Sequence, residues 1–312
     1  VIATPGEPYV CIGFHQDLER EVDVEFCQRR GLPIVRRETG GGAVYLDRDQ
    51  LFVQWVMAPG RLPVRIEGRF ELFARPLIAT YREFGIEASF RPINDIQVAG
   101  RKITGTGAAR IGEAEVVVGN FLFDFDSGLM AQILRAPSDA FRDQVDRSLR
   151  AYMTSMRREL GTAPAPDEVA QRYLHHCADA LGEELRAGEL DPREIEAIEH
   201  TEQRFRSAEF LRQPGGLRRP GVKIHEDVFV AESVGQSTTG TLRVTARVRE
   251  GRIEDVALGE SCSHGEDTRE LEGALRGVEL KAEPVARAVR AHSNLTEVDA
   301  WVQTILNLQN TT

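Results

Sequence analysis

The sequence predicts an α+β protein made of two domains. Short apolar strands dominate residues 1–126, and a helical pattern then runs from 127 to about 209. A segment rich in proline and glycine follows, after which the chain begins again with strands and ends with helices. We therefore expect a first domain over residues 1–212, a linker over 213–221 and a small α+β domain over 222–312.

Composition excludes several classes of protein. The 312 residues carry a formal net charge of −10, so a general nucleic-acid binder is not expected, because such proteins need a basic face. We find neither a secretory signal peptide nor an apolar run of about 20 residues, and we expect no membrane partner. The start at Val1 without methionine suggests a trimmed beginning. The four cysteines lie far apart, which favours reduced thiols and a cytoplasmic location.

The first domain opens with alternating strand and helix signals. Asp23 is placed to cap a short helix that Gly31 ends, and strands are expected at 9–13, 32–35 and 51–57. A longer helix ends at Gly85, and one of its faces carries a set of large apolar side chains. That set, which we expect in the core, is Phe70, Phe73, Leu77, Tyr81 and Phe84.

Later segments follow the same two periodicities. A hairpin is expected with arms at 96–98 and 101–103, and a long strand from 115 to 126. Helices are expected from Pro166 and from Asp191-Pro192. The apolar stripe expected on the first of them is Val169, Tyr173, Leu174, Cys177, Leu181 and Leu185. The second domain is expected to hold strands at 222–230, 239–248 and 253–258, then helices from about 268, 283 and 296.

The single lysine of the first 222 residues is the most informative residue. Of the 39 basic residues, 36 are arginine, and the three lysines are Lys102, Lys223 and Lys281. Lysine is a compact ammonium, whereas arginine is a broad planar fork. Lys102 lies beside Thr104 and Gly105, where glycine allows backbone N–H groups to approach an anion next to the charge. Chance placement of one lysine is the alternative, and we favour a functional role.

A run of three glycines is the second candidate site. Gly40, Gly41 and Gly42 follow Arg36 and Arg37 in an otherwise apolar region. A bulge or bend would explain them structurally, and close approach of backbone to a ligand would explain them functionally. Glycine loops with basic flanks commonly hold phosphate, so we favour the ligand. The segment is not a Walker A loop, because no Gly-Lys-Ser/Thr follows.

Three segments together resemble the lipoate–protein ligase A family, within the biotin/lipoate ligase and octanoyltransferase superfamily. They are Arg36–Tyr45, Asn94-Asp95 and Gly100–Gly105, in this order and at this spacing. The resemblance implies a biotin/lipoyl ligase-like mixed sheet flanked by helices, followed by an accessory C-terminal domain. It also implies two reactions, in which lipoate and Mg-ATP first form lipoyl-adenylate and an acceptor lysine then takes the acyl group.

The resemblance also assigns residues to this chemistry. Lys102 matches the lysine that contacts the acyl carbonyl and the phosphate, where fixed positive charge would hold two anions together. The remaining nucleotide and acyl-adenylate contacts implied are Arg36, Arg37, Thr39, Gly40, Gly41, Gly42, Ala43, Val44, Tyr45, Asn94, Asp95, Thr104 and Gly105. We expect Asp95 to help place Mg²⁺ or the incoming amine.

Departures from the family concern the walls of the acyl pocket. Leu46 stands where the family usually has histidine, and Val118-Gly119-Asn120 replaces its usual His-Gly-Thr/Ser. Thr39 keeps the hydroxyl of the usual serine. The family's first strand and helix have no counterpart before Val1. These changes leave the choice between lipoate and octanoate open.

The acceptor and the rival activities also stay open at this point. Acceptors consistent with the resemblance are a 2-oxoacid dehydrogenase lipoyl domain, a glycine-cleavage H-like protein or a sulfur-oxidation lipoate-binding protein, and we expect a monomeric enzyme. An octanoyltransferase would need a cysteine in the stretch 89–95, which has none. A biotin ligase would carry a Gly-Arg-Gly-Arg type loop in place of 36–42. A non-catalytic binding module is the remaining alternative, against which Lys102 counts.

Overall fold

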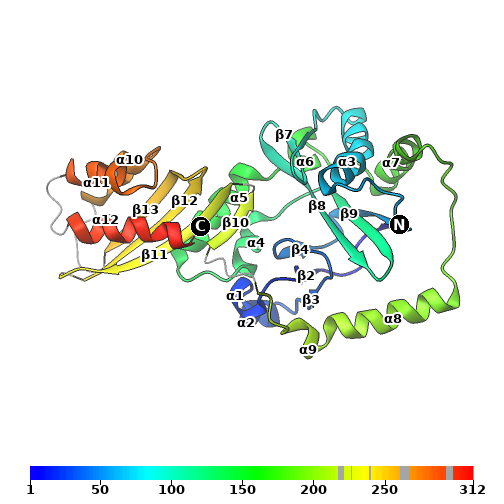
Figure 1. The fold of residues 1–312 in the computed structure, drawn as a ribbon, viewed down its shortest axis with the longest axis horizontal. Coiled ribbons are helices and arrows are strands. Elements are labelled where there is room, and N and C mark those ends of the chain that lie inside the picture. The colour runs from blue at the N-terminus through cyan, green and yellow to red at the C-terminus, as the bar shows by residue number, and fades with distance from the viewer. Residues whose placement is uncertain (217–220, 226, 239, 261–266, 293–297, 312) are drawn as a thin grey trace. The chain divides into compact units, whose positions relative to one another are not determined.

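The computed structural model describes residues 1–216, 221–225, 227–238, 240–260, 267–292 and 298–311. These residues form an α+β fold, as expected, and the chain divides into two compact units (Figure 1). Unit 1 comprises Val1–Arg135 and Tyr152–Leu217, and unit 2 comprises Ala136–Ala151 and Arg218–Thr312. The segment Ala136–Ala151 thus groups with the C-terminal residues. The sequence-based division, with one linker at 213–221, had included this segment in the first domain. Residues 217–220 of that linker lie outside the described residues.

A six-stranded antiparallel sheet forms the centre of unit 1. The strand order is β1-β5-β9-β8-β7-β6, so strands distant in sequence become neighbours. The strands are β1 (Ile2–Ala3), β5 (Gln50–Met57), β6 (Ser89–Arg91), β7 (Asp95–Val98), β8 (Arg101–Ile111) and β9 (Ala114–Leu122). The expected hairpin is confirmed as β7 and β8, joined at Ala99 and Gly100, both with positive φ (48° and 80°).

Two helices cover one face of this sheet. They are α3 (Ile66–Glu83) and α7 (Pro166–Leu181), which pack on each other and on the apolar side of β5, β8 and β9 (Figure 1). The aromatic face expected on the first helix is confirmed, since Phe70, Phe73, Leu77 and Tyr81 are all buried. Lys102 lies on the opposite face of the sheet, which these two helices do not cover.

Unit 1 also contains a three-stranded sheet of order β3-β2-β4. Its strands are β2 (Tyr9–Ile12), β3 (Ile34–Arg36) and β4 (Val44–Leu46), with β3 parallel and β4 antiparallel to β2. Helices α1 (Leu18–Glu21) and α2 (Val24–Arg29) lie between β2 and β3 in the chain. Asp23 caps α2 as predicted, because its carboxylate accepts the Phe26 N–H at 2.9 Å.

The rest of unit 1 is helical, as expected after residue 127. Its helices are α4 (Ser127–Ile133), α6 (Met156–Leu160), α8 (Pro192–Arg206) and α9 (Ala208–Leu211). A capping box at Asp191 and Glu194 begins α8, close to the predicted start. Every described helix is too short or too polar to span a bilayer.

Unit 2 is a four-stranded antiparallel sheet with helices packed against it (Figure 1). Its strands are β10 (Gly221–His225), β11 (Val228–Gln236), β12 (Thr241–Arg249) and β13 (Arg252–Glu260). Its helices are α5 (Asp139–Tyr152, whose last residue the packing assigns to unit 1), α10 (Asp267–Leu275), α11 (Ala282–Arg290), α12 (Val298–Leu306) and a final 3₁₀ turn, η1 (Asn307–Thr311). The starts predicted near 268 and 283 are right within one residue. The positions 239 and 296, where another strand and helix were expected to begin, lie outside the described residues.

Three sequence predictions are wrong in detail. The strand expected at 222–230 is two strands, because Asp227 adopts positive φ (59°) between β10 and β11. The strand expected to reach 126 ends at Leu122, because Asp126 caps α4 through the Leu129 N–H. The stripe on α7 is shorter than expected: the helix ends at Gly182 in the left-handed region, and Leu174 and Leu185 are exposed.

Candidate active site

A β-bulge orients the side chain of Lys102. In the β7–β8 ladder Gln97 pairs with Lys102, but its neighbour Ile96 pairs with Thr104, so β8 contains one extra residue. Ile103 and Thr104 are both buried on the core side, and the alternation resumes with the opposite phase. Lys102 and Gly105 therefore lie on the same face, although a regular strand would place them on opposite faces.

The ammonium of Lys102 lies above Gly105 and against Asp95. Its Nζ is 2.6 Å from Asp95 Oδ1, and the two side chains are 22% and 5% exposed. A β-carbon at Gly105 would lie 3.6 Å from the same Nζ, so glycine leaves space around the charge. Asp95 is the residue that pairs with Gly105 across the ladder. The bulge thus brings the Lys102 ammonium and the Asp95 carboxylate together beside Gly105.

The backbone of Lys102 is also fixed from behind. The Thr154 N–H donates to the Lys102 carbonyl at 2.9 Å, and Met153 forms a parallel bridge with Lys102. Thr154 and Ser155 are almost completely buried. The next hydrogen bond along β8 joins Asn94 Nδ2 to the Thr106 carbonyl at 2.9 Å, and the Thr106 hydroxyl donates to the Asn94 carbonyl. The main chain around the lysine is therefore held on both sides.

Arg37 shapes the glycine loop, which we define as residues 39–43. Its guanidinium donates to the carbonyls of Gly40 (2.9 Å), Gly42 (2.8 Å) and Cys11 (3.1 Å). Gly41 adopts a φ of 100°, which an L side chain rarely adopts. A β-carbon there would also lie 2.8 Å from an Arg37 nitrogen. Carbonyls of the loop are thus turned towards arginine.

The opposite side of the loop offers backbone donors. The N–H groups of Gly40, Gly41 and Gly42 donate no hydrogen bond to any described residue. Consecutive backbone N–H groups of this kind form anion-binding concavities. The loop also lies against the lysine strand, because a β-carbon at Gly107 would be 3.7 Å from Cβ of Thr39. The two segments singled out in the sequence are therefore neighbours.

Two of the expected ligand residues face elsewhere. Arg36 is 0% exposed and donates to main-chain carbonyls, and burial lowers the pKa of its guanidinium from the ordinary value. Thr104 is 1% exposed on the core side of the bulge, where its hydroxyl bonds the Asn120 carbonyl and lies 2.9 Å from the Tyr81 hydroxyl. In these positions both side chains bond to carbonyls of the protein itself, and a ligand contact for either residue stays a prediction.

A second hydrogen-bonded row was missed in the sequence. Asn120 Nδ2 donates to Gln50 Oε1 at 3.2 Å, and Gln50 Nε2 donates to the Tyr45 carbonyl at 3.0 Å. This row connects β9 of the large sheet to β4 of the small one. Asn120 occupies a position where the sequence departs from the family pattern, and that departure was the available signal.

The described cysteines do not resemble nucleophiles. Cys11, Cys27 and Cys177 are buried, and burial raises the pKa of each thiol, that of Cys27 to about 11. A reactive cysteine needs the opposite shift and an accessible position. Cys11 lies closest to the glycine loop, with its sulfur 3.7 Å from Arg37 Nη1. Cys262 lies outside the described residues.

Resident metal binding has little support at Asp95. The described residues contain no group of three His, Cys, Asp or Glu side chains that could hold a metal ion. Asp95 is itself close to the Lys102 ammonium. Magnesium in nucleotide sites is held by one or two carboxylates together with substrate phosphates. Asp95 as a magnesium ligand therefore stays a prediction.

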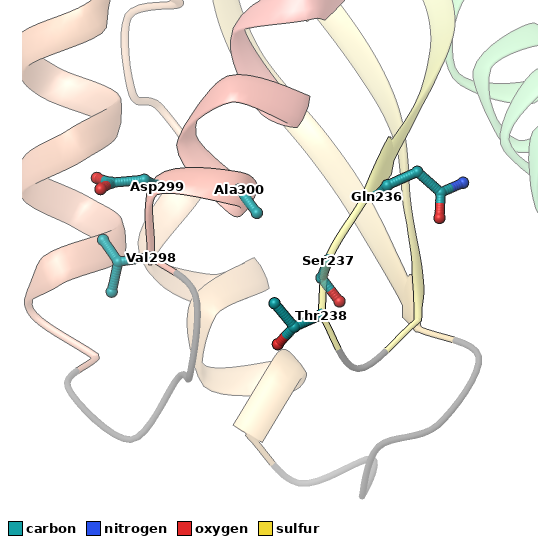
Figure 2. A pocket seen from close by; sticks show the side chains of 6 residues that line it. All are labelled: Gln236, Ser237, Thr238, Val298, Asp299 and Ala300. Atoms are coloured by element: carbon teal, nitrogen blue, oxygen red, sulfur yellow. The ribbon is translucent and has the colours of Figure 1, made fainter.

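A hollow of about 580 Å³ exists in unit 2, between the end of β11 and the start of α12 (Figure 2). Its lining is Gln236, Ser237, Thr238, Val298, Asp299 and Ala300. Figure 2 shows Gln236 directed away from the other five. The lining contains one carboxylate and no cation, so the hollow lacks the charge arrangement found around Lys102 in unit 1.

Comparisons with known proteins identify the first part of the chain. Residues 2–178 match the family model described as the lipoyl protein ligase A/B catalytic domain. An octanoyltransferase LipM from Kyrpidia tusciae is 29% identical over 216 residues, 62% of this chain and 78% of that protein. A lipoate–protein ligase from Streptococcus pyogenes is 26% identical over 298 residues, 91% of this chain and 81% of that protein.

Solved structures agree with these relatives. A structure from a study of the archaeal lipoylation system of Thermoplasma acidophilum, a bipartite lipoate protein ligase and its E2 lipoyl domain, has a TM-score of 0.61 to this chain at 25% identity. The match covers 68% of this chain and 82% of that one. Similarity thus extends to a ligase over 91% of the chain and to a transferase over 62% of it.

Proposed function

The chain belongs to the lipoyl protein ligase A/B family, and we propose that it is an ATP-dependent lipoate–protein ligase. Membership makes it an enzyme of the group that attaches lipoyl or octanoyl groups to proteins. The proposal adds activation of the acid by ATP. The observation that carries it is the Lys102–Asp95 pair over Gly105, on the strand whose Gly107 lies against Thr39 of the glycine loop.

Two further observations favour ligase over transferase. The alignment with a ligase extends through both units, whereas the transferase alignment covers 62% of the chain. A transferase that works through a cysteine needs an accessible thiolate, and the described cysteines are buried with raised pKa values. The transferase nevertheless remains the second candidate, because a LipM protein is among the relatives.

The first reaction joins two anions. A lipoate carboxylate oxygen attacks the α-phosphorus of ATP, the bond to the β-phosphate breaks, and pyrophosphate leaves. We assign the phosphates to the N–H groups of Gly40, Gly41 and Gly42; the carbonyls of Gly40 and Gly42 accept hydrogen bonds from Arg37. The ammonium of Lys102 then lies where it reduces repulsion between carboxylate and phosphate and stabilises the charge that develops between them.

The second reaction transfers the acyl group. The amine of an acceptor lysine attacks the acyl carbonyl of the adenylate, the mixed anhydride breaks, and AMP leaves. Lys102 polarises that carbonyl in this scheme, and Asp95 beside it provides a carboxylate near the incoming amine. The acceptor is a lipoyl domain of a 2-oxoacid dehydrogenase, a glycine-cleavage H-like protein or a sulfur-oxidation lipoate-binding protein. The bipartite Thermoplasma ligase is described together with its E2 lipoyl domain, which supports this class.

Release of pyrophosphate tests the proposal. The protein is incubated with Mg-ATP and either lipoate or octanoate, with and without acceptor domains, and the acceptors are weighed as intact proteins. Acid-dependent pyrophosphate and an acceptor mass increased by one acyl group support the ligase. Acyl transfer from an acyl carrier protein without ATP would replace it with the transferase. Binding without either reaction would indicate a non-catalytic module.

A further inference from the structure

Arg36 is the most completely buried cation of the described structure, and phosphate binding does not account for it. Its side chain is 0% exposed, and no described carboxylate lies within ion-pair distance of it. A buried guanidinium is costly unless its N–H groups are hydrogen-bonded. Five carbonyl oxygens accept from it instead, which suggests that the side chain holds main chain in place.

The two terminal nitrogens of Arg36 bind different parts of the chain. Nη1 donates to the carbonyls of Phe14 and Gln16, both at 2.7 Å, and to that of Gly13 at 3.3 Å. Nη2 donates to the carbonyls of Leu211 and Gln213, both at 2.8 Å. The planar fork thereby joins two segments nearly 200 residues apart in sequence. A single lysine ammonium would have to place all its donors on one atom and could not reproduce this geometry.

The first of these segments, residues 13–16, contacts the glycine loop directly. The Phe14 N–H donates to the Thr39 carbonyl at 3.0 Å. A β-carbon at Gly13 would lie 2.1 Å from the Gly41 carbonyl oxygen, so the two backbones are in closest approach there. Any displacement of residues 13–16 must therefore move Thr39 or Gly41.

The second segment is anchored beyond Arg36 as well. The Gly215 N–H donates to Asp17 Oδ1 at 2.8 Å. A β-carbon at Gly215 would lie 2.3 Å from the His15 carbonyl oxygen and 2.4 Å from the carbonyl carbon of Gln16. The chain around Gly215 therefore packs closely against residues 13–16, the segment that also contacts the glycine loop.

We propose that Arg36 is a positioning residue, which ties the 211–215 segment to residues 13–16 and thereby sets the position of the phosphate-binding glycine loop. This inference rests on the proposed function for the identity of the phosphate ligand, ATP. It makes the start of the expected linker part of the nucleotide site's support. A perturbation at Gly215 is expected to change ATP use without touching ATP, lipoate or any charged group.

A matched pair of glycine substitutions tests this coupling. Gly215→Ala forces the 13–16 segment to move, whereas Gly188→Ala has open space and an unstrained φ. We expect Gly215→Ala to raise KM for ATP about tenfold, equivalent to about 1.4 kcal/mol. KM for lipoate should change by less than a factor of about two, as a single ATP-site effect requires. Gly188→Ala should match the wild type in both.

Amide hydrogen exchange separates failure of the inference from failure of the proposed function. Exchange at residues 39–43, measured without substrates, should be faster in Gly215→Ala than in Gly188→Ala. This holds even if the wild type releases no lipoate-dependent pyrophosphate, a result that would end the ligase proposal alone. Equal exchange in the two variants overturns the inference, as does a parallel rise of both KM values.

Two additional variants keep the test decisive should Gly215→Ala not fold. Asp17→Ala removes the acceptor of the Gly215 N–H and should shift KM for ATP in the same direction by a smaller factor. Arg36→Lys keeps the charge but loses the two-sided fork, and should increase both KM for ATP and exchange at 39–43. Unchanged values in both folded variants would equally overturn the positioning role.

Discussion

Replacing Lys102 with alanine removes the ammonium that pairs with Asp95 and lies over Gly105. The other two lysines of the chain, Lys223 and Lys281, belong to unit 2. The carboxylate of Asp95 stays in place and would add negative charge next to the carboxylate and phosphates of the substrates. The variant should therefore lose attraction and gain repulsion at the same point.

The size of the loss follows from distance and exposure. Two unit charges about 3 Å apart interact by about 5 kcal/mol at an effective dielectric constant of about 20. Lys102 is 22% exposed, so water screens part of this interaction. Removal of one preorganised donor from an oxyanion site costs about 3–4 kcal/mol, or roughly 10²- to 10³-fold in rate. We expect a decrease of that order in kcat/KM for pyrophosphate release.

Lipoate-dependent pyrophosphate release is the assay, with transfer from chemically prepared lipoyl-adenylate as a second readout. Lys223→Ala, an exposed lysine of β10, is the matched control and should behave as the wild type. Thermal unfolding shows whether Lys102→Ala is folded. A folded Lys102→Ala with pyrophosphate release within about threefold of wild type would refute the electrostatic mechanism, since a factor of three corresponds to only about 0.7 kcal/mol.

Three other predictions concern the glycine loop, the thiols and one half-buried carboxylate. Gly41→Ala should lower the free energy of unfolding in urea by about 1–2 kcal/mol, because φ of Gly41 is positive. At Gly40 an added β-carbon has room, so Gly40→Ala should change the free energy of unfolding by less than about 0.5 kcal/mol. Equal effects of the two substitutions would contradict the loop geometry. Burial raises the pKa values of the Cys11 and Cys27 thiols, so iodoacetamide at pH 8 should leave the activity of a C262S variant intact. Cys11→Ser should likewise keep most of the activity. Inactivation in either experiment would favour the transferase. Burial also raises the pKa of Glu21, so the ionised carboxylate destabilises the folded state. Glu21→Gln should therefore have a higher Tm than the wild type near pH 7, and this difference in Tm should disappear as the pH falls below the ordinary pKa of about 4.3. A difference in Tm that does not change with pH would count against this reasoning.

Sequence patterns identified segments that the structure brings together, but they did not predict the side-chain directions within them. The unusual lysine and the triple glycine were identifiable because each breaks a local rule of composition, and the β7–β8 hairpin had a turn signal at Ala99-Gly100. The bulge was not predictable. Strict alternation from Lys102 would place Thr104 on the ligand side, and one extra residue in the ladder reverses that phase.

Neighbouring arginines could not be told apart for a related reason. Arg36 and Arg37 are equivalent in sequence, yet one is fully buried and the other shapes the glycine loop. The carbonyls that select Arg36 come partly from Leu211 and Gln213, which are 175 and 177 residues away. No local pattern contains that information. The same holds for Thr154, which binds the Lys102 carbonyl from a distant helical region.

Helix α5 has a practical consequence for anyone dividing this protein into pieces. Its buried Phe141, Val145 and Leu149 belong to unit 2, and Gln144 Nε2 donates to Asp255 on β13 at 3.1 Å. A fragment that ends at residue 212 would contain α5 without the part of unit 2 on which it packs. A fragment that begins at residue 222 would lack α5 altogether. The first piece would expose the apolar side of α5 and the second would lose the helix that packs on it, so each half should be less stable than in the whole chain.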